Sequence, residues 1–391
     1  MKLKASIWAT VFVVAFEASL LGAEPTHNAA LEAAVEKIGR GFELLGHYKD
    51  VPTRAIFGEG RPTKIKAVAF SGENLAAVTR GGDVCVWDRT TSKLTRTFSH
   101  FQLPETKGVA QHGIAKACFS EGGKLVCMDD CFFHVALWDV VSGKVIAKHD
   151  EGREMVVVCA IAISPDCKQI ALAGFDDTEN NEEEGIVALW NPNAKVVRTI
   201  RPKNQERACA VDFQPKGHLL AVNCLEKKSS DSRYSLWNVE TARLEKELPY
   251  KGFGENRIQF DGTGRYLVGV TNLPDRERGG SMVLRCWDVK NNKLHRDVEW
   301  GEPFSFSPNS LKMVACRNFP QLTLIDLMGG SDRFLVKFKE EELPTATCFS
   351  ADGKLLLVGT DLGNVYLFRI REVSQEPPVE RKKAAKEQNG R

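Results

Sequence analysis

The stretch FSADGKLLLVGT, residues 349–360, has the form of a strand end, a tight turn and a second, almost purely aliphatic strand. Its turn contains Asp352 and Gly353, which suit a hairpin because Asp bonds to nearby backbone and Gly accepts a positive φ. One such hairpin predicts only a pair of strands. Its variants, however, return at regular intervals along the chain.

Seven positions carry an aromatic residue or Ile followed by a small or polar residue and a turn. These marker residues are Phe70, Phe119, Ile163, Phe213, Phe260, Phe306 and Phe349, spaced 43 to 50 residues apart. An aliphatic run such as KLVCMD follows each turn. A later strand ends in Trp, as in VALWD, or in LTLID and VYLFR in the last two repeats. Four short strands per repeat predict an all-β fold, a seven-bladed β-propeller of four-stranded blades over residues 47–370.

These repeats resemble those of the WD40 repeat family over most of that range. The phrases that match the family's signature dipeptide are Trp87-Asp88, Trp138-Asp139 and Trp287-Asp288, with near matches at Trp190-Asn191 and Trp237-Asn238. Most repeats lack the family's opening Gly-His, and blades six and seven have Ile325 and Phe368 in place of the Trp. The resemblance implies a ring-shaped scaffold that holds protein or peptide partners.

The N-terminus has the layout of a secretory signal. Lys2 and Lys4 precede an apolar run that ends at Phe16, and the small residues Gly22 and Ala23 follow. We expect residues 1–23 to be a signal peptide and the mature protein to be periplasmic or secreted. The alternative is an uncleaved N-terminal segment that tethers the protein. No stable membrane span is expected after cleavage, because no second apolar segment approaches spanning length.

Three predictions concern the segments flanking the repeats. Residues 24–46 are predicted to form a short amphipathic helix, since Leu31, Val35, Ile38, Phe42 and Leu45 have helical spacing. The last repeat ends at its third strand, so we expect residues 53–57, TRAIF, to pair outside it and close the ring. Residues 371–391 are charged and contain Pro, which predicts a disordered tail.

Composition and motifs exclude several classes of function. A net charge of +2 argues against nucleic-acid binding, which usually leaves a basic footprint. The eight histidines lack the spacing of a metal site, and no nucleophile elbow, P-loop or dinucleotide fingerprint occurs. No catalytic residue, metal or cofactor is therefore predicted.

The eleven cysteines are read as small buried residues, because most lie in apolar strands and no CxxC pair occurs. Cys159 and Cys209 are expected to lie too far apart for a disulfide. Cys127 and Cys131, which flank a loop, are the one pair that we would check.

The longest insertions fall in the loops between second and third strands and in the connections between blades, which leave the same face of a propeller. They are 99–113, 175–185, 225–233 and 271–281. Insertions that gather on one face often mark the binding side of a repeat protein. The candidate partner-binding residues there are Phe101, His112, Asp176, Asp177, Glu182, Glu183, Glu184, Lys227, Lys228, Arg233, Arg276 and Arg278.

The leading hypothesis is an exported, non-enzymatic scaffold that binds a protein or peptide on this insertion-bearing face. One alternative is a periplasmic hydrolase or lyase that uses the central channel, where Lys116, Asp212, Arg257 and Glu302 are candidate lining residues. Another is a TolB-like propeller, which six blades or the absence of Trp from the third strands would favour.

Overall fold

The computed structural model describes most of the chain between residues 35 and 371. The described ranges are 35–49, 51–52, 64–103, 113–130, 134–149, 157–177, 183–194, 196–202, 205–226, 232–249, 253–273, 281–298, 301–308, 310–317, 320–329 and 331–371. The predicted signal peptide, the proposed closing strand 53–57 and residues 372–391 lie outside these ranges.

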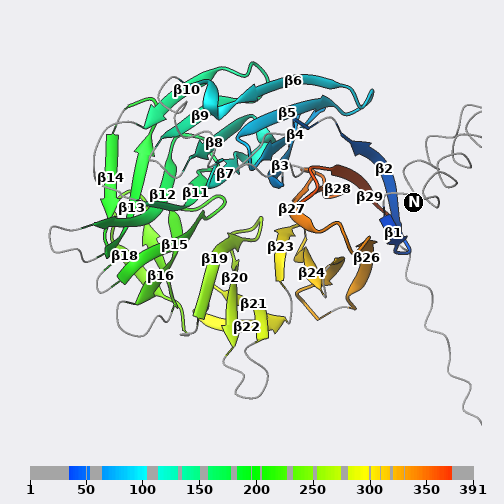
Figure 1. Ribbon diagram of the computed structural model, residues 1–391. Coiled ribbons are helices and arrows are strands. Elements are labelled where there is room, and N and C mark those ends of the chain that lie inside the picture. The colour runs from blue at the N-terminus through cyan, green and yellow to red at the C-terminus, as the bar shows by residue number, and fades with distance from the viewer. Residues whose placement is uncertain are drawn as a thin grey trace, which may run out of the picture.

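Seven antiparallel sheets stand around a central axis, which confirms the predicted seven-bladed propeller (Figure 1). Blade 1 contains β3 (Ile65–Ser71), β4 (Asn74–Thr79), β5 (Asp83–Asp88) and β6 (Leu94–Ser99). Blade 2 contains β7 (Lys116–Phe119), β8 (Leu125–Asp129), β9 (Val135–Asp139) and β10 (Val145–His149). Blade 3 contains β11 (Val157–Ile163), β12 (Ile170–Asp177), β13 (Glu183–Asn191) and β14 (Val196–Ile200). In each blade the first of these strands lies nearest the axis.

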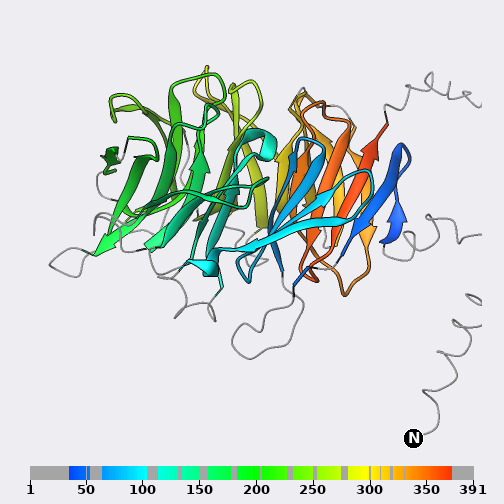
Figure 2. The same cartoon turned by 90° about the horizontal axis from the view of Figure 1, so that it is seen from above.

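The next two blades are also built from consecutive strands. Blade 4 contains β15 (Gln205–Phe213), β16 (Leu219–Glu226), β17 (Ser232–Asn238) and β18 (Leu244–Glu247). Blade 5 contains β19 (Phe253–Phe260), β20 (Tyr266–Leu273), β21 (Ser281–Asp288) and β22 (Lys293–Val298). There are also two short 3-10 helices. The first, η1 (His100–Gln102), follows β6, and the second, η3 (Glu121–Gly123), lies between β7 and β8 on the opposite face of the disc (Figure 2).

The last two blades each take a strand from the N-terminal segment. Blade 6 contains β23 (Gly301–Phe306), β24 (Lys312–Arg317), β25 (Gln321–Asp326) and β26 (Arg333–Phe338), with β1 (Val35–Ile38) as a fifth, outermost strand. Blade 7 contains β27 (Pro344–Phe349), β28 (Leu355–Thr360) and β29 (Val365–Ile370), with β2 (Phe42–Tyr48) as its fourth strand. The consecutive strands β1 and β2 therefore belong to two neighbouring blades.

The predicted helix over 24–46 is wrong for residues 35–46, where the structure has these two strands. In β2, Phe42, Leu44, Gly46 and Tyr48 alternate as buried positions, which is the period of a strand. At the turn between β1 and β2 only Gly fits at position 39, since a Cβ there would lie 2.0 Å from the carbonyl oxygen of Phe334. The apolar spacing that suggested a helix is thus shared by two short strands and the turn between them.

Closure by the N-terminal segment occurs, but through residues nearer the N-terminus than 53–57. The register of β2 against β29 runs from Phe42 opposite Ile370 to Tyr48 opposite Val365. The His47 Nε2–H donates to the Asn364 side-chain oxygen at 3.0 Å, and the ring stacks on Tyr366 with ring centroids 4.4 Å apart. These contacts fix the fourth strand of blade 7.

A buried carboxylate reinforces this blade. Glu342, 6% exposed, accepts hydrogen bonds from the Thr360 hydroxyl at 2.8 Å, the Asn364 amide at 2.7 Å and the Tyr366 hydroxyl at 3.0 Å. Burial, followed by the nearby Glu342 charge, raises the pKa of Tyr366. Three donors therefore converge on one acidic side chain beside the closing strand.

The core consists of apolar side chains packed between neighbouring blades. Trp87 and Trp287 are almost completely buried, and their indole nitrogens donate to the carbonyl oxygens of Lys49 at 3.1 Å and Pro249 at 3.2 Å. Each of these acceptors lies in a segment that precedes an inner strand. The Trp near the end of the third strand thus packs between blades and also holds, by a hydrogen bond, the connection that leads to an inner strand of the channel wall.

Candidate functional site

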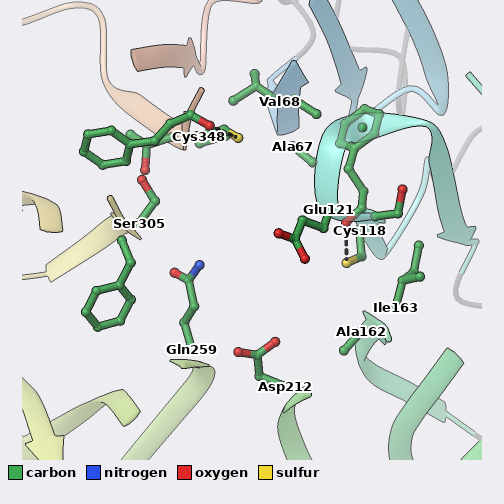
Figure 3. Close-up of a pocket in the computed structure, with 18 of the residues that line it drawn as sticks. Ala67, Val68, Cys118, Glu121, Ala162, Ile163, Asp212, Gln259, Ser305 and Cys348 are labelled. Carbon is green, nitrogen blue, oxygen red and sulfur yellow. Dashed lines mark hydrogen bonds between the residues drawn. The ribbon is translucent and has the colours of Figure 1, made fainter. Parts of the chain in front are cut away.

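The inner strands of all seven blades surround a cavity of about 1410 Å³ along the ring axis (Figure 3). Its lining extends from the starts of the inner strands, such as Lys66 and Glu302, to the turns that follow them, such as Pro165 and Lys216. The cavity therefore runs through the depth of the disc. All four residues expected to line the channel, Lys116, Asp212, Arg257 and Glu302, do so.

The position one residue before the marker differs in chemistry around the channel. The residue just before the marker residue is Asp212 in blade 4, Gln259 in blade 5 and Ser305 in blade 6, and these side chains form one side in Figure 3. On the opposite side this position is Cys118 in blade 2 and Ala162 in blade 3, and the Glu121 carboxylate lies beside Cys118. Sequence analysis missed Gln259 and Ser305, although their place one residue before the marker was a usable signal.

Asp212 acts as a link between two blades. Its carboxylate accepts a hydrogen bond from the backbone N–H of Phe260 in blade 5 at 2.7 Å. Burial raises the pKa of Asp212 to about 7, and the backbone hydrogen bonds and the Arg257 charge oppose this rise. The carboxyl group is committed to the wall of the ring, because the exposed edge of an inner strand leaves N–H groups that require acceptors.

Other polar side chains of the channel bond to the following blade in the same way. The Arg257 guanidinium donates to the carbonyl oxygen of Phe304 at 2.7 Å and lies 4.7 Å from the centre of that ring. The Thr345 hydroxyl donates to the carbonyl oxygen of Ile65 at 2.7 Å, which joins blade 7 to blade 1. These bonds satisfy backbone groups of neighbouring inner strands.

Bulges place several of these side chains in the channel. The register of the inner strands shifts by one residue at Lys66, Cys159, Cys209 and Thr345 in blades 1, 3, 4 and 7. A bulged residue lies outside the regular alternation, so its side chain is re-aimed. Among the described residues, no group of three or more His, Cys, Asp or Glu side chains is arranged to hold a metal ion.

On the insertion-bearing face, the structure brings Asp176 of blade 3 close to Arg201. The Arg201 guanidinium donates to the Asp176 carboxylate at 2.7 Å, and the Asp176 side chain is only 15% exposed. Nearby, the Arg207 guanidinium of blade 4 lies 4.7 Å from the centre of the Phe175 ring. The base of this insertion is therefore held by an ion pair with the connection that follows β14 and by a cation–π contact with blade 4.

The strands extend further into the predicted loops than the sequence suggested. Asp177 pairs in register with Glu183, and Glu184 is the second residue of β13, opposite Asp176. In blade 4, Arg233 belongs to β17 and forms ion pairs with Glu226 and, at 3.4 Å, with Glu247. Asp176 and Arg233 thus support the loops instead of standing at their tips.

Phe101 is not available to a partner, which corrects its place among the candidate residues. It is 7% exposed and packs with Leu103 and Ile114 in the apolar cluster between blades 1 and 2. The Ser99 hydroxyl caps η1 by accepting from the Phe101 N–H at 3.3 Å. An aromatic residue in a predicted loop was read as a contact residue, whereas it fills a gap between blades.

The remaining candidates lie outside the described residues. They are His112, Glu182, Lys227, Lys228, Arg276 and Arg278. Asp177 and Glu183 are described by their backbone alone. The described parts of the chain contain no helix with the length and apolar character needed to cross a membrane.

Comparison with known proteins adds no further assignment. No protein-family model and no curated protein sequence matched the chain. The structure therefore classifies the chain as a seven-bladed β-propeller. Its likeness to WD40 repeats is a resemblance that rests on the Trp-Asp phrases.

Proposed function

We propose that this propeller is an exported, non-enzymatic scaffold that binds a protein or peptide partner on its insertion-bearing face. The absence of catalysis is proposed because the polar side chains of the channel form hydrogen bonds between blades. Asp212 accepts from Phe260 and Arg257 donates to Phe304, so both groups bridge blades of the ring. A general acid or a substrate-binding cation would instead have to direct these atoms at a ligand.

The choice of face rests on the distribution of chain length and charge. In blades 3 and 4 the second strands end at Asp177 and Glu226 and the third strands begin at Glu183 and Ser232, so both insertions start from the same side of the disc. Their bases are held by the pairs Asp176–Arg201 and Arg233–Glu226. A rigid scaffold that carries charged loops from fixed points is a common arrangement for binding surfaces.

Two alternatives have less support. The rise in the pKa of Asp212 favours an enzyme in the channel, but its burial and its hydrogen bond with the Phe260 N–H already account for the position of this group. A TolB-like propeller was expected to have six blades, whereas this ring has seven. We therefore retain binding without catalysis as the function that the geometry supports best.

The test is affinity capture from the exported fraction of the source cells with two double variants. Each variant removes two positive charges. Lys227→Gln with Lys228→Gln alters the insertion-bearing face, and Lys168→Gln with Lys216→Gln alters the first turns of blades 3 and 4 on the opposite face. We expect the first variant to lose captured partners and the second to retain them. Equal recovery by both would contradict the chosen face, and an absence of the protein from the exported fraction would contradict export.

A further inference from the structure

Two cysteines face each other across the first two strands of blade 2. Cys118 of β7 and Cys127 of β8 are direct partners in the register. Both pack in the apolar cluster between blades 2 and 3, so their side chains lie on the same face of the sheet. Among the described cysteines, this is the one pair that a sheet register places directly opposite each other.

The geometry of such a pair is compatible with a disulfide. Directly opposed residues of antiparallel strands have Cα atoms about 4.5–5.5 Å apart. A disulfide needs a Cα separation of about 4.4–6.8 Å. The pair that sequence analysis singled out, Cys127 with Cys131, includes a residue outside the described ranges, and the register supplies Cys118 as the partner of Cys127 instead.

The two thiols differ in their access to the channel. Cys118 is half-buried and lines the cavity, where its thiol donates to the carbonyl oxygen of Phe119 at 3.4 Å (Figure 3). Cys127 is 0% exposed. Burial raises the pKa of Cys118 to about 12 and that of Cys127 well above its ordinary value. Because the thiolate is the reactive form, oxidation of the folded protein should be slow and should begin at Cys118.

We propose that Cys118 and Cys127 form an oxidation site that a low-molecular-weight disulfide reaches through the central channel. The Cys118 sulfur attacks one sulfur of the reagent, and the other half leaves as a thiol after taking up the Cys118 proton. The Cys127 sulfur then attacks the Cys118 sulfur and displaces the second half as a thiol. Two protein thiols are oxidised to one disulfide, and the reagent is reduced to two thiols.

Blade 7 contains a matched control for this chemistry. Cys348 holds the same place in its inner strand as Cys118, one residue before the marker, and also lines the cavity. Its thiol donates to the carbonyl oxygen of Phe349 at 3.3 Å, as Cys118 does to Phe119. The residue opposite Cys348 is Leu357, which cannot resolve a mixed disulfide.

The experiment treats the folded full-length protein with oxidised glutathione at mildly alkaline pH. The sample is quenched with acid, alkylated under denaturing conditions, and its peptides are identified by mass spectrometry. We expect Cys118 and Cys127 to appear as one cross-linked peptide pair with no glutathione attached. Cys348 should appear as a stable mixed disulfide with glutathione. The Cys127→Ala variant should convert Cys118 to the same stable mixed disulfide.

Three results would overturn the proposal. A stable glutathione adduct on Cys118 in the unaltered protein would show that Cys127 does not reach it. Modification of Cys348 with no reaction at Cys118 would show that access to blade 2 is closed. No reaction at either residue would show that the channel does not admit the reagent. None of these results depends on partner capture, so the scaffold function is tested separately.

Discussion

Blades 3 and 7 contain the same turn but are assembled in different ways. In blade 3, Ser164 donates to Asp166 at 2.7 Å and accepts from the Gln169 N–H at 2.9 Å. In blade 7, Ser350 donates to Asp352 at 2.6 Å and accepts from the Leu355 N–H at 2.9 Å. Blade 3 is nevertheless one continuous stretch, whereas blade 7 takes its outer strand from residues 42–48.

This difference separates what local sequence determines from what it does not. The turn needs only Ser, Asp and a residue that accepts a positive φ, all within five positions, so it recurs wherever that pattern recurs. The outer strand of blade 7 needs a partner from the other end of the chain. Contacts of such high sequence separation must overcome a larger entropy of loop closure, and no local pattern announces them.

Removing the N-terminal strands should have the largest effect. A variant lacking residues 24–49 loses both the pairing of β2 with β29 and that of β1 with β26. The outer edges of blades 6 and 7 then become exposed, which favours aggregation. We expect the variant to lose its cooperative thermal transition, measured by circular dichroism. The deletion removes no residue of blade 3, so such a loss would come from the missing edge strands of blades 6 and 7. As a control, removal of residues 372–391 should leave the melting temperature unchanged; a normal transition in the first variant would refute this account of closure.

The Glu342→Ala change should have a smaller but clear effect on blade 7. It leaves the donors of Thr360, Asn364 and Tyr366 without their shared acceptor inside the protein. Unpaired buried donors each cost about 1–3 kcal/mol, so we expect a loss of about 3 kcal/mol or more in the free energy of unfolding. Urea denaturation measures this loss. The neighbouring Glu341 is exposed, and Glu341→Ala should change stability by less than about 0.5 kcal/mol. Equal effects of the two changes would contradict a stabilising role for the hydrogen bonds of Glu342.

The smallest effect concerns the shared turn itself. Cys167 of blade 3 has φ 58°, and its counterpart in blade 7 is Gly353 with φ 70°. Because a side chain disfavours the left-handed region, Cys167→Gly should stabilise the protein by up to about 1 kcal/mol. The reverse test, Gly353→Ala, should destabilise it, since the added Cβ would also lie 3.0 Å from the Ser307 hydroxyl. Denaturant midpoints that move in the same direction for both variants would contradict the equivalence of the turns.

The predictable part of this protein is its repeating part. The marker residues, the turns and the Trp-ended strands each repeat with a regular period, and together they specified seven blades and the inner strands that line the channel. The predicted helix was wrong between Val35 and Leu45, because an apolar spacing of three and four residues also fits two short strands around Gly39 and Gly41. The prediction that Phe101 contacts a partner was wrong because its burial between blades depends on neighbours such as Ile114, which the sequence around Phe101 does not reveal.

The candidate site was less predictable than the fold for a related reason. The charges of Asp176 and Arg233 were visible in the sequence, but their partners Arg201 and Glu226 became apparent only once the strands were placed. Likewise, the opposition of Cys118 and Cys127 depends on the register of a hairpin, which a shift of one residue would abolish.

The pairing of β2 with β29 also limits when the ring can be completed during synthesis. The hydrogen bond between Glu43 and Arg371 joins residues 328 positions apart. At the usual rate of translation, β2 waits on the order of tens of seconds before β29 is made. Throughout that interval Phe42 and Leu44 lack the side chains of blades 6 and 7 against which they pack, whereas Tyr48 can already contact blade 1. The outer strand of blade 7 therefore cannot find its place before the last repeat has been made, and until then the backbone edge of β2 has no partner strand from that blade.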